Sequence, residues 1–202
     1  MRKLDCMTRT FSVLAILLTV AMCATIGVGF WSFFLPDSNF KNDVFLAHFY
    51  LGLGTALLIL LVHCLIFTYF LGTGRWVKEV GLAYKLRDEE LPRATRELKR
   101  ATFPPALFSM LIVIATSAAG AGRLMQDWPW QLHTALAFLT LLVNLWAFYV
   151  EYHAVTENAQ VIQAVLEEVD RIRGAAGLNS NAEALVEDRE NQAPVANRPP
   201  SG

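Results

Sequence analysis

The four histidines are the residues of this chain best suited to chemistry, and all of them lie inside or at the edges of two long apolar runs. They are His48, His63, His133 and His153. An imidazole at membrane depth can bind a metal ion, relay a proton or form a buried hydrogen bond. The role of each histidine therefore depends on its depth and on the direction that it faces.

His48 and His133 each lie about one turn after the start of their run, so helices that enter from the same side would hold them at similar depth. Two inward imidazoles at equal depth are the geometry for axial ligation of one haem, here a haem b. Gly52 and Ala137, one turn deeper than each histidine, would leave room for the flat macrocycle. The sequence thus predicts metal binding by His48 and His133 only as haem iron ligands.

A different interpretation treats His48 and His133 as interfacial residues with their polar tips among lipid headgroups. A second haem is not predicted, because the deeper histidines do not match in level. By the rise per residue, His63 lies ~22 Å beyond His48, while His153 lies ~30 Å beyond His133. His153 is expected at the other membrane interface.

His63 lies on a helix that is otherwise rich in Leu, Ile and Val, so its imidazole needs a buried partner. We expect it to form a buried hydrogen bond with Asn144, Ser109 or Thr116 that stabilises the contact between helices. A proton or metal relay through His63 is the alternative.

A polar stripe runs along the fourth apolar run, and we expect it to face the interior of a bundle. Its members are His133, Ala137, Thr140, Asn144, Ala147 and Glu151. Glu151 falls at the far end of the stripe, where we expect it to pair with Arg75 or Lys78.

Four apolar runs define the elements that hold these residues. They are Phe11–Leu35, Val44–Leu71, Phe103–Gly120 and Trp130–Val150. About 20 helical residues cross the hydrocarbon of a bilayer, so the fold class predicted is all-α, a four-span up-and-down membrane bundle. The first run is too long for a cleaved signal and is expected to remain as a helix. The second and fourth helices are expected to lie side by side, and no internal repeat is apparent between them.

Charge patterning predicts the orientation. The net charge is only −1, but Lys and Arg number three in residues 1–10, eight in 72–102 and four after residue 150. Positive charge marks the cytoplasmic side, which predicts both termini inside the cell. Twelve Arg against five Lys, with abundant Ala, suggest a bacterial genome and hence the cytoplasmic membrane.

The predicted domain organisation follows from these runs. Residues 1–10 form a cytoplasmic N-terminus, 11–150 the membrane domain with its cytoplasmic loop 72–102, 151–178 an amphipathic helix and 179–202 a disordered tail. The loop is expected to hold two helical pieces, 75–86 and 94–101, which form a small cytoplasmic helical cap with residues 152–173. Heptad spacing of Val155, Ile162 and Val169 fits either packing on the protein's own loop or contact with a homodimer or membrane-complex partner through residues 152–173.

Motifs of soluble enzymes are absent from the sequence: no phosphate-binding loop, HExxH or GxSxG is present. Three scattered cysteines indicate neither zinc nor a disulfide framework, and the basic loop suits the lipid bilayer better than nucleic acid. The sequence therefore favours a protein without enzymatic activity. In order of preference, we expect a scaffold, assembly or sensory protein acting through its cytoplasmic helices, a haem-b electron carrier, or a small transporter or proton-conducting subunit using His63, Asn144 and Glu151.

Overall fold

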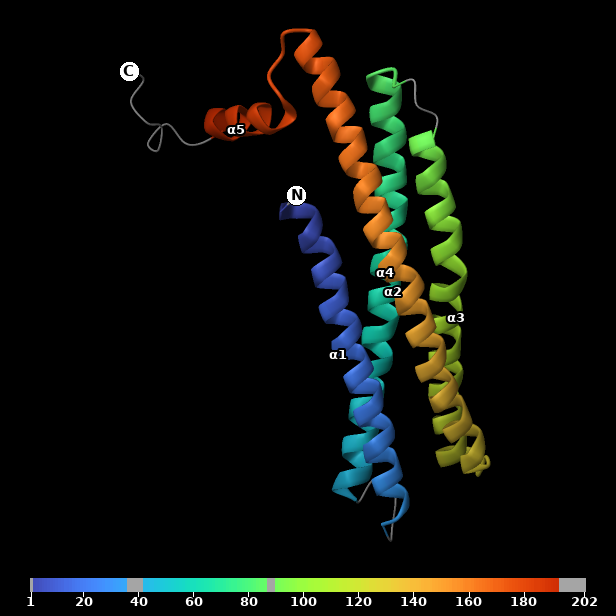
Figure 1. Cartoon of the computed structure of the whole chain (residues 1–202). Coiled ribbons are helices and arrows are strands. Elements are labelled where there is room, and N and C mark those ends of the chain that lie inside the picture. The colour runs from blue at the N-terminus through green and yellow to red at the C-terminus, as the bar shows by residue number, and fades with distance from the viewer. Residues whose placement is uncertain (1, 36–41, 87–89, 193–202) are drawn as a thin grey trace.

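The computed structural model describes residues 2–35, 42–86 and 90–192, and every regular element in this part of the chain is a helix, as predicted (Figure 1). The helices are α1 (Arg2–Phe33), α2 (Asp43–Ala83), α3 (Glu90–Gln126), α4 (Trp130–Ala175) and α5 (Asn181–Gln192). In the view of Figure 1, α1 and α3 end, and α2 and α4 begin, at the lower end of the molecule. This end holds His48 and His133 and is called the histidine end. The opposite end carries most of the Lys and Arg residues and is called the basic end.

Helix ends follow ordinary capping rules. The Asn42 side chain accepts hydrogen bonds from the amides of Val44 and Phe45 at 2.9 and 3.4 Å, which satisfies the first turn of α2. At the end of α4, Gly177 takes a φ of 71°, and the Leu178 amide donates to the Arg173 carbonyl at 2.9 Å. A left-handed glycine with this bond closes the helix and satisfies its last carbonyls.

The four long helices enclose one core in which each helix has two neighbours. α1 and α3 each pack against both α2 and α4, whereas the backbones of α1 and α3 lie apart in the described residues; at the histidine end the Arg123 guanidinium of α3 lies 5.7 Å from the centre of the Phe33 ring of α1. α2 and α4 therefore face each other diagonally across the core, with a smaller contact, and are not the side-by-side neighbours expected from the sequence. Short connections make consecutive helices adjacent, which leaves α2 and α4 on opposite corners.

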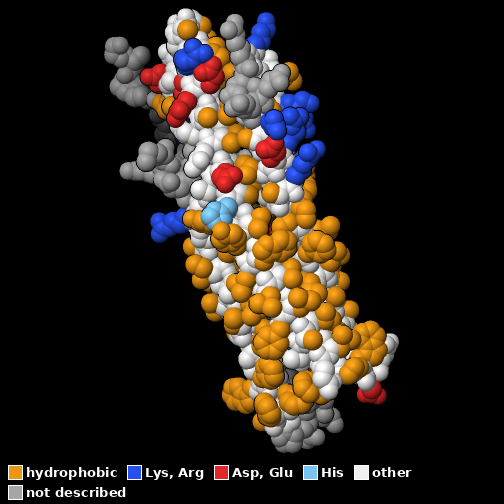
Figure 2. Space-filling model, turned by 45° about the vertical axis from the view of Figure 1, so that its right-hand side comes forward, with side chains coloured by type: hydrophobic (Ala, Val, Ile, Leu, Met, Phe, Trp, Pro, Cys, Tyr) orange, Lys and Arg blue, Asp and Glu red, His pale blue; other side chains and the backbone are white. Residues whose placement is uncertain are grey.

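α1 to α4 are all long and apolar enough to cross a membrane, which supports a multi-pass membrane protein. Figure 2 shows hydrophobic side chains covering the lower part of the visible face, while acidic and basic side chains gather on its upper part. Each of the four long helices has large apolar residues that are at least half exposed, for example Ile16, Leu57, Leu111 and Leu142. Water would make such a surface costly, whereas acyl chains would not.

The loop expected over 72–102 is mostly continuous helix. α2 runs to Ala83, so its 41 residues extend about 60 Å, roughly twice the hydrocarbon thickness. α3 begins at Glu90 and passes through Pro104 and Pro105 without ending. The prolines leave the carbonyls of Arg100 and Ala101 without their usual helical partners. Both of these residues are exposed, so their carbonyls can be solvated and the helix continues.

The heptad seam of α4 packs on this chain's own helices. Val165 and Val169 are buried with Val77 of α2, and side chains around them come from the end of α2 and the start of α3. Packing within the chain was one of the two alternatives left open by the heptad spacing.

The tail predicted as disordered contains a helix, α5. Ser180 and Glu183 form a reciprocal capping box: the Glu183 carboxylate accepts from the Ser180 amide at 2.9 Å, and the Ser180 hydroxyl accepts from the Glu183 amide at 3.3 Å. This local signal outweighs the polar composition from which disorder was predicted. The remainder of that tail, 193–202, lies outside the described residues.

Candidate functional site

The structure brings His48 of α2 and His133 of α4 together across the core at the histidine end. Their ring centroids are 6.1 Å apart, and the ring planes are nearly perpendicular at 81°. Both residues are half-buried, and they come from the two helices that face each other diagonally.

Both imidazoles are held in the same way by the backbone of the helix that precedes their own. His48 Nδ1 lies 3.0 Å from the carbonyl oxygen of Thr25, and His133 Nδ1 lies 3.0 Å from that of Thr116. A carbonyl oxygen only accepts, so each Nδ1 carries the hydrogen and donates it. Each neutral ring then keeps its lone pair on Nε2, which has no hydrogen bond to any described residue. This is the tautomer in which a histidine binds a metal through Nε2.

A glycine lies under each ring. A Cβ added to Gly29 would lie 2.7 Å from Cε1 of His48, and a Cβ added to Gly120 would lie 3.0 Å from Cε1 of His133. Both glycines are therefore needed for the rings to lie where they do. Sequence reasoning missed these glycines, because nothing within one apolar run shows which residue of another helix will cover it.

Gly52 and Ala137 lie one turn beyond His48 and His133, as the sequence places them. A Cβ at Gly52 would lie 3.4 Å from the methyl group of Thr25, which is an ordinary van der Waals contact. Ala137 is half-buried. Their role in making room for a macrocycle stays a prediction.

The two halves of the site repeat one pattern. Thr25 and Thr55 hydroxyls are 3.2 Å apart between α1 and α2, and Thr116 and Thr140 hydroxyls are 2.7 Å apart between α3 and α4. In each half a glycine follows the first threonine by four residues, and the second threonine follows the histidine by seven. The structure thus has an internal repeat where none was expected. Its four residues are spread over two helices, and the spacing from glycine to histidine differs between the halves, which hides the pattern in the sequence.

A second polar group lies deeper in the core and contains His63, Asn144 and Glu151. His63 Nδ1 is 2.7 Å from Glu151 Oε1, and His63 Nε2 is 3.1 Å from Asn144 Oδ1. All three side chains are fully buried, and His63 stacks on Phe148 with ring centroids 5.7 Å apart. Of the three partners expected for His63, the structure selects Asn144.

The sequence suggested that Glu151 pairs with Arg75 or Lys78, but in the structure it pairs with neither. Arg75 is highly exposed and pairs with Glu79 at 2.7 Å on its own helix. Glu151 lies on the buried stripe of α4, so it faces the core and finds His63 there. The stripe is otherwise as predicted: Thr140, Asn144 and Ala147 are also buried.

A series of hydrogen-bonded residues lies between the two polar groups, and we call it the polar column. Its bonds are made by separate atoms of Thr116 and Thr140, whose hydroxyls and carbonyls have different partners. The Thr116 hydroxyl lies 2.7 Å from that of Thr140, and the Asn144 amide donates to the Thr140 carbonyl at 2.9 Å. Asn144 then contacts His63, which contacts Glu151. The column therefore leads from the backbone carbonyl that holds His133 to a buried carboxylate.

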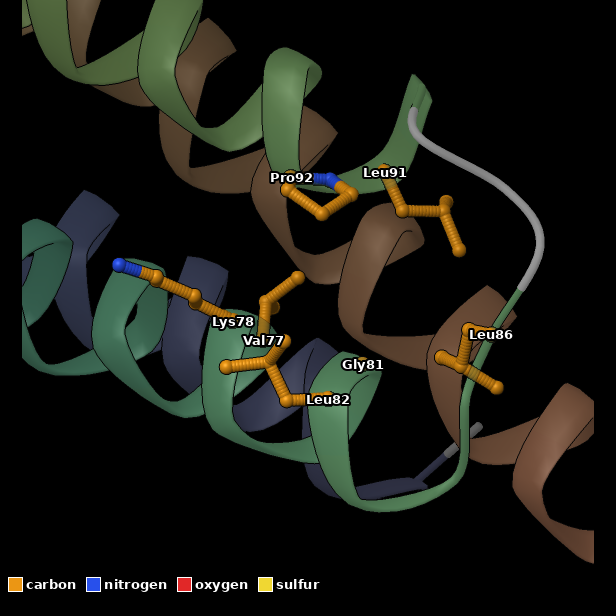
Figure 3. A pocket seen from close by; sticks show the side chains of 7 residues that line it. All are labelled: Val77, Lys78, Gly81, Leu82, Leu86, Leu91 and Pro92. Carbon is orange, nitrogen blue, oxygen red and sulfur yellow. The ribbon is translucent and has the colours of Figure 1, made fainter.

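Other parts of the described chain offer less. His153 is exposed beside Tyr149, with ring centroids 4.6 Å apart, in keeping with an interfacial position. A hollow of about 160 Å³ lies between the end of α2 and the start of α3 (Figure 3). Its lining is Val77, Lys78, Gly81, Leu82, Leu86, Leu91 and Pro92, which includes no side chain that ordinarily binds a metal. The hollow lies at the basic end, away from the histidine pair.

No group of three or more His, Cys, Asp or Glu side chains suited to one metal ion occurs in the described part of the chain. The histidine pair is therefore a two-ligand arrangement.

Comparisons with known proteins add no family. No family model, no curated protein and no solved structure matches this chain.

Proposed function

We propose that this chain is an integral membrane protein that binds one haem b between His48 and His133 and carries electrons. The observation that carries the proposal is the facing pair of imidazoles, 6.1 Å apart, each held through Nδ1 by a backbone carbonyl. The remaining nitrogen of each ring is left for a metal.

The separation of the rings supports ligation of one iron. An imidazole nitrogen lies about 2 Å from a metal that it binds, so two imidazoles on opposite sides of one ion have centroids roughly 6 Å apart. The distance between His48 and His133 agrees with that value. Perpendicular ring planes are compatible with it, because each ring can turn about its own bond to the metal.

Haem fits two protein ligands better than a bare ion does. A zinc site needs three or four protein ligands, and no third His, Cys, Asp or Glu joins the pair within the described residues. A porphyrin supplies four nitrogens itself and needs only the two axial ligands from the protein. Gly29 and Gly120 lie close to the ring atoms of His48 and His133 and so limit where each ring can lie.

Electron transfer is the chemistry expected of such a haem. His48 and His133 would hold the haem iron together, and a haem held by two histidines would supply one-electron transfer without an open position for oxygen or a substrate. The protein's part is to hold the rings and to exclude water from the iron.

The proposal includes a four-span up-and-down arrangement in a bacterial cytoplasmic membrane, with both termini inside. The concentration of Lys and Arg at the basic end supports this orientation. The haem would then lie in the outer half of the bilayer.

Absorbance tests the proposal directly. The chain is produced in a host supplied with a haem precursor and purified in mild detergent, and the Soret band and the haem content per chain are measured. We expect one haem per chain in the unmutated protein and a loss of at least most of it in His48→Ala and in His133→Ala. His153→Ala is the matched control and should keep its haem, because this exposed histidine lies outside the pair. A colourless protein despite supplied haem, or ligand variants that keep as much haem as the unmutated protein, would overturn the proposal.

A further inference from the structure

The buried pair of His63 and Glu151 has a definite hydrogen count. The Asn144 amide nitrogen donates to the Thr140 carbonyl, so its Oδ1 faces His63 Nε2 as an acceptor. His63 Nε2 must then carry a hydrogen. At the other ring nitrogen, Nδ1 and Glu151 Oε1 are 2.7 Å apart and share one further proton. With that proton the pair is neutral overall, whichever atom holds it.

Loss of the shared proton would leave an uncompensated negative charge in the core. His63 and Glu151 are fully buried, and among the described residues Glu151 has no other partner of opposite charge. A charge left alone in an apolar interior is expensive, so the pair keeps its proton or exchanges it with water along a polar route.

The structure contains the beginnings of such a route. Glu151 Oε2, Asn158 Oδ1 and Ser109 Oγ are buried and have no hydrogen-bond partner among the described residues. Buried polar atoms are nearly always hydrogen-bonded, and where the protein offers no partner the usual one is water. Each of these atoms therefore indicates a bound water, and one of the three, Oε2, belongs to Glu151 itself.

Asn158 extends the route toward the basic end. It follows Glu151 by seven residues on the same buried face of α4, about 10 Å farther along the helix. Its amide donates to the Tyr69 hydroxyl at 3.0 Å and to the Thr73 hydroxyl at 3.1 Å. Both hydroxyl-bearing residues are only half-buried, so this cluster reaches from the core toward solvent.

Among the described side chains around the buried pair, Glu151 and His63 themselves are the acidic and basic groups. α1 contributes apolar side chains to the core here, Phe11 among them, and Phe11 packs on Phe148 with ring centroids 6.3 Å apart. Tyr69 on α2 is the titratable group toward the basic end, and α3 adds the hydroxyl of Ser109. Lys99 of α3 lies over the Phe103 ring at 5.9 Å, toward the outside of the bundle.

We propose that His63 and Glu151 form a proton-binding site inside the bundle, filled from the basic end through water held between Glu151 Oε2 and Asn158. The proton passes from water to the carboxylate and is then shared with His63 Nδ1; no other bond changes. The proposal uses neither His48 nor His133 and does not depend on haem.

Infrared difference spectroscopy between acidic and alkaline buffer tests the site in the haem-free full chain. We expect the carbonyl band of a protonated carboxylic acid, shifted on transfer to deuterated water and absent in Glu151→Gln. The amide of that variant can still hydrogen-bond to His63, so the fold is preserved while the titration is lost. Glu157→Gln, an exposed acid on the same helix, is the matched control and should keep the band. An unchanged spectrum in Glu151→Gln overturns the proposal.

Two further measurements keep the test independent of one variant. In the unmutated protein with nitrogen-labelled histidine rings, the His63 Nδ1 resonance should move together with the Glu151 carboxyl band, because Nδ1 is hydrogen-bonded to Glu151 Oε1 and shares the proton that is gained or lost. A His63 resonance that does not move while the band changes contradicts the proposal. Asn158→Leu should slow deuterium exchange at the Glu151 band by about tenfold, since it removes a water-binding group. An unchanged exchange rate overturns the proposed route.

Discussion

Two glycines determine where the rings of His48 and His133 can lie. Gly29 and Gly120 bring the backbones of α1 and α3 close to the imidazoles: a methyl group at Gly29 would force the His48 ring to move, and one at Gly120 would push the His133 ring by a few tenths of an ångström. At residue scale, the proposed site depends on the glycines as well as on the histidines. The histidines supply the nitrogen ligands, and the absence of a Cβ at the glycines leaves room for the rings in their observed orientation.

Gly29→Ala should displace the His48 ring and lower haem occupancy at least several-fold. Gly120→Ala should have a milder effect, because the closest approach there is 3.0 Å against 2.7 Å at Gly29. The measurement is haem content per chain, with the Soret band as readout. Gly27→Ala is the control on the same helix, since no atom lies within 4 Å of a Cβ at that position. Alanine also favours helix over glycine by about 0.5–1 kcal/mol, so this variant should be slightly more stable. Equal haem loss in all three variants would contradict the contact argument.

A second residue-scale prediction concerns the cost of breaking the buried pair. Removing one partner, as in His63→Leu, leaves Glu151 without its only partner in the core and should destabilise the protein by about 3–5 kcal/mol. The double variant His63→Leu with Glu151→Leu removes both polar groups and should be more stable than either single variant. Denaturation in detergent gives the four free energies of unfolding. Additive effects of the two substitutions would show that the groups are not coupled.

Sequence reasoning reached the histidine pair but missed much of what surrounds it. The residue type and its distance from the start of the helix were enough to predict that His48 and His133 lie close together, because both can be read from each helix separately. Gly29, Gly120 and the partner of Glu151 depend on which face of one helix meets which face of another. Charge complementarity assigned Glu151 to Arg75, but the burial of Glu151 ruled out that exposed partner.

At the scale of elements, length and apolarity located four helices but not their ends. The apolar runs mark only the part of each helix that suits hydrocarbon, whereas hydrogen bonding continues wherever solvent can satisfy the backbone. α2, α3 and α4 therefore extend well beyond their apolar runs, and their extensions pack on one another at the basic end. The predicted helical cap is thus a continuation of the bundle.

The seam of α4 should stabilise the single chain and leave its oligomeric state unaffected. Val165 is fully buried against Val77 and its neighbours, so Val165→Ala should lower the free energy of unfolding by about 1–3 kcal/mol. The molecular mass measured in detergent should not change. Leu82→Ala is the control, because Leu82 is 71% exposed at the same end and should cost little. A change from dimer to monomer in Val165→Ala would instead favour the contact between copies.

At the scale of the whole molecule, two equivalent hairpins each contribute one histidine, one glycine and two threonines to the proposed haem site. The equivalence then ends. The position 15 residues after His48 is His63, but the position 15 residues after His133 is Phe148, which stacks on His63. Asn144 and Glu151 occupy the deeper level from α4. The bundle thus combines a symmetric site for electrons at the histidine end, as proposed, with an asymmetric site for a proton deeper in the core, and the polar column lies between them.

If both proposals hold, the two sites should influence each other through the low-dielectric core. His63 follows His48 by 15 residues, about 22 Å along α2, and two unit charges at that distance interact by roughly 0.7 kcal/mol at an effective dielectric constant of about 20. A proton at the pair stabilises the reduced haem, so the midpoint potential should fall by about 30 mV as pH rises through the titration of the pair. Redox titration of the haem-loaded protein at several pH values measures this shift. Glu151→Gln should retain haem and lose the shift, whereas Glu157→Gln should retain both. A shift of the same size in Glu151→Gln would assign the coupling to another group and leave the proton-binding site of His63 and Glu151 without a role in electron transfer.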